Sequence, residues 1–211
     1  PAFLSVDEEG GTVARVAANE AFGVTNVGNM SDIGAAGDAQ KAYDAGVTIG
    51  TYLKQLGFNV DYAPVADVLT NPGNTAIGTR SFGSDASMVA DMVIKELEGL
   101  SSQGVFGAVK HFPGQGGVSG DSHDGAVTLD KSLEELMQTE LVPFQKALEN
   151  GVSFVMVGHI SVPQVVGDNT PASLSQMMVS NVLREQLGYQ GIVITDAMNM
   201  GAVTGNYTAD Q

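Results

Sequence analysis

The sequence contains no cysteine, few basic residues and no long hydrophobic run. The absence of cysteine excludes disulfides, thiolate metal sites and cysteine nucleophiles. Nine Lys and Arg residues against 24 Asp and Glu residues give a formal charge of −15, and such a surface repels nucleic-acid phosphates and anionic lipid. No run of about 18 apolar residues is present, so we expect no membrane-spanning segment. Neither nucleic acid nor a membrane is therefore an expected partner.

The 211 residues are 43% hydrophobic and 16% charged, which is enough apolar material to bury a substantial core. Five short apolar runs recur, each followed by polar residues, a glycine-rich loop and a helical stretch. The runs are continuous rather than alternating, which is typical of parallel strands buried on both faces. The predicted strands are residues 2–6, 58–65, 105–109, 153–157 and 191–195.

Amphipathic segments with recognisable ends lie between these strands. Three of them stop at a glycine that follows the last apolar turn, at Gly57, Gly151 and Gly188, as helices commonly do. The predicted helices are residues 38–56, 84–102, 130–150 and 173–187, with a shorter one around 13–21.

The alternation of strand, loop and helix is typical of an α/β protein. Right-handed crossovers leave two main architectures, a doubly wound sheet and a (β/α) barrel. The sequence Glu9-Gly10-Gly11-Thr12 lacks the GxGxxG spacing of a dinucleotide site. We therefore predict a (β/α)8 TIM-barrel type fold, here with about five βα units, in one domain over residues 1–211.

Polar side chains follow the predicted strands, where barrels carry their chemistry. All three histidines of the chain, His111, His123 and His159, lie at strand ends or on the next loop, which indicates a functional role for at least one of them. A metal site built from these histidines and Asp121 is an alternative, but neither HxH nor HExxH spacing occurs.

Structural roles also remain open for several of these residues. Asp7 or Asp61 could cap a helix or accept from backbone amides. Lys110 and His111 could form a buried ion-pair network, and His159 could be a core histidine that bonds a carbonyl.

Six stretches, in order, carry a resemblance to a known family. They are SVDEEGG at 5–11, NVDYAPVADV at 59–68, RSFG at 80–83, KHFPG at 110–114, DSH at 121–123 and ITDAM at 194–198. The chain resembles the catalytic domain of glycoside hydrolase family 3, and most closely its bacterial β-N-acetylglucosaminidase (beta-hexosaminidase) branch.

The resemblance implies a retaining glycosidase with Asp196 as its nucleophile. The acid/base would be His123, paired with Asp121, because an adjacent carboxylate raises the histidine pKa and fixes its tautomer. A histidine base leaves phosphorolysis open beside hydrolysis. No metal or organic cofactor is implied.

The resemblance also implies a set of residues that hold the terminal sugar through hydrogen bonds. These residues are Asp7, Arg15, Arg80, Lys110 and His111, with Met198 lining the pocket. Asp61 and Asp67 match less securely. Gln115 and Thr12 depart from the histidine and arginine that are common in this branch, which places substrate contacts or loop packing in question rather than the reaction.

We expect the first barrel strand to precede Pro1 and two βα units to follow Gln211, because the family barrel has eight units. Exposed strand edges would then favour self-association. The expected activity is exo-hydrolysis of terminal β-linked N-acetylglucosamine from peptidoglycan fragments or chitin-type oligosaccharides. The alternatives are another family 3 β-glycosidase, a glycoside phosphorylase, or a silent sugar-binding barrel fragment. The compartment stays open between the bacterial cytoplasm and the cell surface or exterior.

Overall fold

The five predicted strands form one parallel sheet. The computed structural model describes residues 2–122 and 125–208. The strand order is β1-β4-β5-β7-β9, with every neighbouring pair parallel. This order follows the chain without reversal, as in a barrel, whereas a doubly wound sheet reverses at a switch point. The strands are β1 (Ser5–Val6), β4 (Val60–Asp61), β5 (Phe106–Phe112), β7 (Phe154–Val157) and β9 (Ile192–Thr195).

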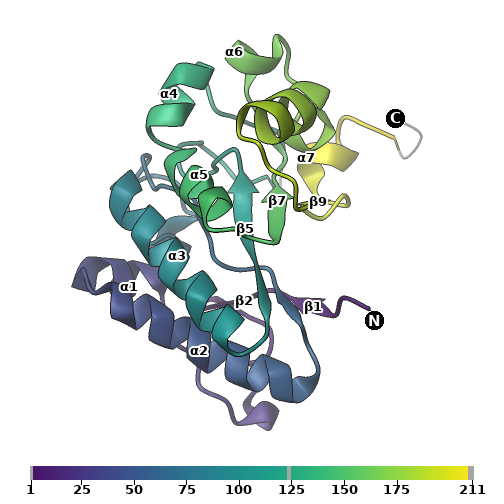
Figure 1. Cartoon of the computed structure of the whole chain (residues 1–211). Helices are drawn as coiled ribbons and strands as arrows, with labels where there is room; N and C mark the ends of the chain where they lie inside the picture. The colour runs from purple at the N-terminus through teal and green to yellow at the C-terminus, as the bar shows by residue number, and fades with distance from the viewer. Residues whose placement is uncertain (1, 123–124, 209–211) are drawn as a thin grey trace.

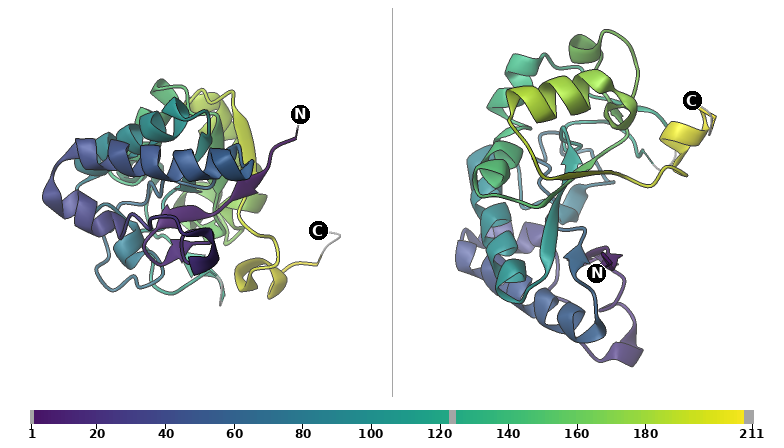
Figure 2. Two further views of the ribbon diagram at one scale, coloured as in Figure 1. Left: turned by 90° about the horizontal axis from the view of Figure 1, so that it is seen from below. Right: turned by 45° about the vertical axis from the view of Figure 1, so that its right-hand side comes forward.

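The sheet curls like part of a barrel wall, with its helices along the outer side. β5 and β7 run upward in Figure 1, while β1 lies across the view. The right-hand view of Figure 2 shows the helices following one side of the sheet from α2 at the bottom to η4 at the top. The predicted α/β fold of TIM-barrel type, with about five βα units, is confirmed.

The two longest helices match their predicted spans closely. α2 (Ala39–Leu56) and α3 (Ala86–Ser102) begin after Asp38 and Asp85, whose carboxylates accept backbone amide hydrogens. The two helices pack closely because each carries a glycine at the crossing. A Cβ on Gly46 would lie 2.3 Å from the Glu96 carbonyl oxygen, and one on Gly99 would lie 2.3 Å from the Tyr43 carbonyl oxygen.

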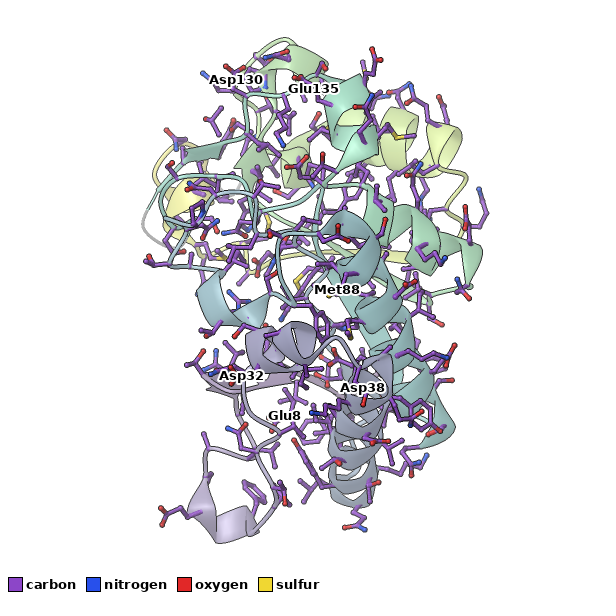
Figure 3. All side chains as sticks on the ribbon, turned by 90° about the vertical axis from the view of Figure 1, so that its left-hand side faces the viewer. Glu8, Asp32, Asp38, Met88, Asp130 and Glu135 are labelled. Carbon is purple, nitrogen blue, oxygen red and sulfur yellow. The ribbon has the colours of Figure 1, made fainter. Side chains whose placement is uncertain are left out.

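The helix predicted over residues 130–150 is two helices, α4 (Leu133–Gln138) and α5 (Val142–Glu149). Pro143 lies in the first turn of α5, a position that proline favours at a helix start. Asp130 and Glu135 lie at the top of the molecule in Figure 3, near α4, whereas Asp38 and Glu8 lie in its lower half. The helix predicted over 173–187 is also divided, into η3 (Ala172–Leu174) and η4 (Met177–Gln186), the latter with π-type hydrogen bonding.

The short helix predicted around residues 13–21 is wrong. The chain instead forms a hairpin of β2 (Glu8–Gly10) and β3 (Val13–Ala14), followed by the 3₁₀ turn η1 (Glu20–Phe22). Gly10 and Gly11 reverse the chain with φ values of 94° and 54°, which only glycine adopts readily. The Glu8 carboxylate then accepts from the amides of Val16 at 2.7 Å and Ala17 at 2.9 Å, and so satisfies groups that a helix would have used.

The remaining elements lie in the connections between the main strands and helices. They are α1 (Met30–Ala36), η2 (Gly78–Arg80), β6 (Val127–Thr128), β8 (Ile160–Ser161), α6 (Pro163–Val166) and α7 (Gly201–Thr204). Among the described residues, no helix combines the length and the apolar character needed to cross a membrane.

Candidate functional site

Charged side chains gather where the parallel strands end. Asp7 follows β1, Lys110 and His111 lie in the last part of β5, and Asp196 follows β9. Because the carboxyl ends of parallel strands meet at one rim, side chains far apart in the sequence come together there.

Glu9 is the centre of a buried ion-pair cluster at this rim. Its Oε1 lies 2.6 Å from Lys110 Nζ, and its Oε2 lies 2.8 Å from Arg80 Nε. Arg80 Nη2 donates to Glu9 Oε1 at 2.8 Å as well, so the guanidinium binds the carboxylate through two nitrogens. Lys110 also donates to Asp7 Oδ1 at 2.8 Å. Lys110 and Glu9 are each 2% exposed, so the cluster is fixed within the protein.

The ionisation of this cluster follows from its pairing. Burial alone would raise the pKa of Glu9, but the charges and hydrogen bonds of Lys110 and Arg80 lower it to about 2. Burial alone would lower the pKa of Lys110, yet Glu9 and Asp7 raise it above its usual value. Glu9 and Lys110 therefore stay charged at neutral pH. An ammonium has three donors, and the contacts with Asp7 and Glu9 account for two of those on Lys110.

His111 is oriented by a fully buried carboxylate. Asp67 Oδ2 lies 2.7 Å from His111 Nδ1, and Asp67 Oδ1 accepts from the backbone amide of His111 at 3.2 Å. A carboxylate only accepts, so Nδ1 carries the proton and Nε2 is the acceptor in the neutral ring. His111 Nε2 lies 3.5 Å from Arg80 Nη2, which joins this pair to the ion-pair cluster.

Asp196 lies next to these groups and is held as a carboxylate. Its Oδ1 accepts from the amide of Ala197 at 2.7 Å. Burial would raise the pKa of Asp196, but His111, the Ala197 amide, Lys110 and His159 together lower it below its usual value. The group is therefore an anion with one oxygen hydrogen-bonded.

His159 bonds a carbonyl, as its structural alternative predicts. His159 Nε2 lies 3.0 Å from the Ala197 carbonyl oxygen, and Nδ1 lies 2.6 Å from Ser173 Oγ. A carbonyl only accepts, so Nε2 carries the proton. His159 is 1% exposed, and its contact with Ala197 holds the segment that bears Asp196.

The other predicted residues lie at the edge of this cluster or outside it. Arg15 is exposed on the hairpin, and its backbone amide donates to the Asp7 carbonyl. Met198 is 45% exposed just beyond Asp196. Asp121 is half-buried on the loop before β6. His123 lies outside the described residues. No group of three or more His, Cys, Asp or Glu side chains suited to a metal ion occurs in the described part of the chain.

Two further buried acids, Asp61 and Glu96, were not predicted as a pair. Asp61 accepts from the Glu8 amide at 3.0 Å through Oδ1, which agrees with its structural alternative. Within the described residues, Asp61 Oδ2 and both carboxyl oxygens of Glu96 find no hydrogen-bond partner. Burial raises the pKa of Asp61 well above its usual value. Burial, and then the negative charge of Glu9, raise the pKa of Glu96 to about 8.

Sequence reasoning missed the roles of Glu9 and Asp67 as counter-ions. Glu9 stood in an acidic run, Asp7-Glu8-Glu9, in which the sequence does not distinguish one carboxylate from the next. The available signal was composition, because the predicted site holds the cations Lys110 and Arg80, and buried cations require buried anions.

Comparisons with known proteins bear on the family and the fold of this chain. The glycosyl hydrolase family 3 N terminal domain matches residues 1–211. Beta-hexosaminidase A of Pseudoalteromonas piscicida is 35% identical over 97% of this chain and 36% of its own length. Beta-hexosaminidase LpqI of Mycobacterium tuberculosis is 38% identical over 98% of this chain and 53% of its own length. The chain thus spans about a third to a half of these relatives.

A solved structure shares the fold in detail. It is a glycoside hydrolase family 3 beta-N-acetylglucosaminidase from Paenibacillus sp. str. FPU-7, with a TM-score of 0.93 and 43% identity. The match covers 98% of this chain and 39% of that one.

Proposed function

Because this chain belongs to glycosyl hydrolase family 3, matching its N-terminal domain, we propose that the protein is a retaining exo-β-N-acetylglucosaminidase. Its substrates would be peptidoglycan fragments or chitin-type oligosaccharides that end in β-linked N-acetylglucosamine. The observation that carries the proposal is the position of the Asp196 carboxylate beside the cluster of Asp7, Lys110, Arg80 and His111. A lowered pKa keeps Asp196 anionic, as a nucleophile must be.

The first step would form a covalent glycosyl-enzyme. The Asp196 oxygen that does not bond the Ala197 amide attacks the anomeric carbon, and the bond from that carbon to the leaving oxygen breaks. His123 gives its proton to the leaving oxygen, so the aglycone departs as an alcohol. Asp121 would pair with His123 and stabilise its protonated ring.

The second step would reverse these roles. Neutral His123 takes a proton from water, whose oxygen attacks the anomeric carbon and releases Asp196. The two inversions give overall retention of configuration. A neutral histidine base adds no negative charge beside the site, which would also allow phosphate to take the place of water.

The sugar would be held by donors and acceptors that the protein fixes before binding. The Lys110 ammonium and the Arg80 guanidinium would donate to sugar hydroxyls, and Asp7 would accept from them. His111 would present Nε2, since Asp67 occupies Nδ1. Arg15 and Met198 would contact the sugar from the edge of the site. Fixed groups lose little freedom on binding, which favours catalysis.

The test is release of p-nitrophenol from its β-N-acetylglucosaminide and from its β-glucoside, with and without added phosphate. We expect activity on the acetamido sugar, and Asp196→Asn should lower kcat by at least about a thousandfold because the nucleophile is lost. Asp91→Asn is a matched control, since the Asp91 side chain is 66% exposed on α3. Preference for the glucoside would contradict the specificity, and full activity of Asp196→Asn would contradict the mechanism. A rate that requires phosphate would identify a phosphorylase.

A further inference from the structure

The Glu8 carboxylate holds the stretch of backbone that follows Arg15. Its Oε2 accepts from the Val16 amide at 2.7 Å, and its Oε1 accepts from the Ala17 amide at 2.9 Å. The Tyr52 hydroxyl donates to the same Oε1 at 2.8 Å. Glu8 is fully buried, so water does not compete for these groups. Both carboxyl oxygens are therefore occupied by donors from the protein itself.

Tyr52 fixes this carboxylate from α2. Its side chain is buried and packs in one apolar cluster with Val16. Burial, and then the hydrogen bond to Glu8, raise the pKa of Tyr52 above its ordinary value, so the phenol keeps its proton and acts as the donor. Through this contact Glu8 is joined to a helix that lies 44 positions further along the chain.

The backbone of Glu8 is held separately from its side chain. Its amide donates to Asp61 Oδ1 at 3.0 Å. Glu8 stands between Asp7 and Glu9, the two anions that contact Lys110. A change confined to the Glu8 side chain keeps the amide that Asp61 binds. Such a change should therefore leave Asp7 and Glu9 in place.

Arg15 lies beside these anions, and its guanidinium is unpaired. Its backbone amide donates to the Asp7 carbonyl oxygen at 3.3 Å, which places its backbone at the rim. Arg15 is exposed, whereas Ala14 and Val16 on either side of it are buried. Among the described residues, the Arg15 side chain makes no hydrogen bond or ion pair. The five N–H donors of the guanidinium are therefore available to a ligand.

We infer that Glu8 is a positioning residue that holds the Arg15 guanidinium where it donates to acceptor oxygens of the terminal sugar. The inference rests on the proposed function, because Arg15 is one of the sugar contacts proposed above. Ordering a loop during binding costs affinity. Because Glu8 fixes Val16 and Ala17 before the sugar arrives, that cost is avoided.

A positioning role and a structural role change different constants. A variant that unfolds in part lowers the concentration of active protein and hence the apparent kcat, but it leaves KM and the Kd for the sugar unchanged. A variant that misplaces Arg15 weakens the sugar contact in the ground state and in the transition state alike. KM and Kd then rise while kcat changes little.

The experiment measures KM and kcat for p-nitrophenyl β-N-acetylglucosaminide, and calorimetry measures the Kd for N-acetylglucosamine. Glu8→Gln keeps the shape but replaces one acceptor oxygen by a donor nitrogen, so one of the two backbone amides loses its partner. KM and Kd should rise about 5- to 20-fold, with kcat within about twofold. Tyr52→Phe removes only the hydroxyl that fixes Glu8 and should raise both constants about two- to fivefold.

A double-mutant cycle with Arg15 tests whether Glu8 acts through it. Arg15→Ala should raise KM and Kd at least as much as Glu8→Gln does. Adding Glu8→Gln to Arg15→Ala should change them by less than about twofold. Tyr43→Phe is the matched control, because Tyr43 lies on α2 and its hydroxyl has no hydrogen-bond partner in the part of the chain described. It should leave KM, kcat and Kd unchanged.

Three results would overturn the inference and leave the proposed function intact. They are additive effects of Glu8→Gln and Arg15→Ala, unchanged constants in Arg15→Ala, and a loss of kcat in Glu8→Gln at constant KM and Kd. An unmodified protein that binds the sugar without cleaving the glycoside would overturn the proposed function, and the Kd values would still test the inference. Absence of both binding and cleavage would overturn both.

Discussion

Two sets of buried acidic side chains lie close together, and they differ in whether a cation contacts them. Glu9 is 2% exposed and Glu96 is 1% exposed, so burial alone does not distinguish them. Glu9 contacts both Lys110 and Arg80, and its pKa is lowered to about 2. Glu96 has no partner for its carboxyl oxygens among the described residues, and its pKa is raised to about 8. Direct contact with a cation, rather than depth, decides which acid stays charged.

The two acids should affect stability in opposite directions as pH changes. The pKa of Glu9 is lowered from 4.5 to about 2, so its contribution is present above pH 4.5 and is lost as pH falls through 2. The pKa of Glu96 is raised from 4.5 to about 8, so its contribution is present below pH 4.5 and is lost as pH rises through 8. These two groups together favour maximum stability near pH 4.5.

The largest expected effect comes from removing Lys110, one of the two cations that contact Glu9. Lys110→Met leaves Glu9 with one cation fewer in a buried position, and we expect a loss of about 3–5 kcal/mol in the free energy of unfolding. Activity should fall at least about a hundredfold, because Asp7 loses its ammonium partner and Glu9 keeps only Arg80. Urea unfolding and kcat/KM test both expectations. Lys95→Met removes an exposed pair with Glu98 on α3 and should cost less than about 1 kcal/mol.

An effect that grows with pH is expected when the unpaired acid loses its ability to ionise. For the unmodified protein, Glu96 should lower the free energy of unfolding by about 1 kcal/mol per pH unit between pH 4.5 and about 8. Glu96→Gln should remove that part of the slope. Urea unfolding at several pH values measures it, and Glu98→Gln on the exposed side of the same helix should keep the slope. An unchanged slope in Glu96→Gln would show that Glu96 is already ionised in the folded protein.

The smallest effect should follow from Asp61→Asn. Burial raises the pKa of Asp61 well above its usual value and so favours its protonated form, and an amide of the same shape should therefore change the free energy of unfolding by less than about 1 kcal/mol. Asp67 is equally buried but accepts three N–H groups, two from His111 and one from Gln115. Asp67→Asn should therefore cost at least about 2 kcal/mol. Equal costs in thermal unfolding would mean that Asp61 is charged.

The sequence predicted elements whose signal is local. The strands were recognised because each is a continuous apolar run, and α2 and α3 because each is an amphipathic segment with recognisable ends. The helix predicted over residues 13–21 failed because the Glu8 carboxylate, eight residues before Val16, binds the amides of that segment. A hydrophobic pattern carries no record of such a contact.

The candidate site divides in the same way. Lys110, Arg80, Asp7 and Asp196 were found from short motifs, and the structure brings them together. Glu9 pairs with Arg80 and Lys110, which lie 71 and 101 positions further along the chain. Asp67 pairs with His111, which lies 44 positions further along. Only the fold determines such pairs. The exposure of Arg15 is likewise a property of the hairpin rather than of its motif.

The contacts of Glu9 also limit how this rim can be exchanged between relatives. Glu9 comes from the hairpin after β1, Arg80 from the connection before α3, and Lys110 from β5. A graft that moved only one of these segments would bring in a charge without its counter-charges. Engineering a new specificity here would require transplanting all three segments together, as one inherited unit.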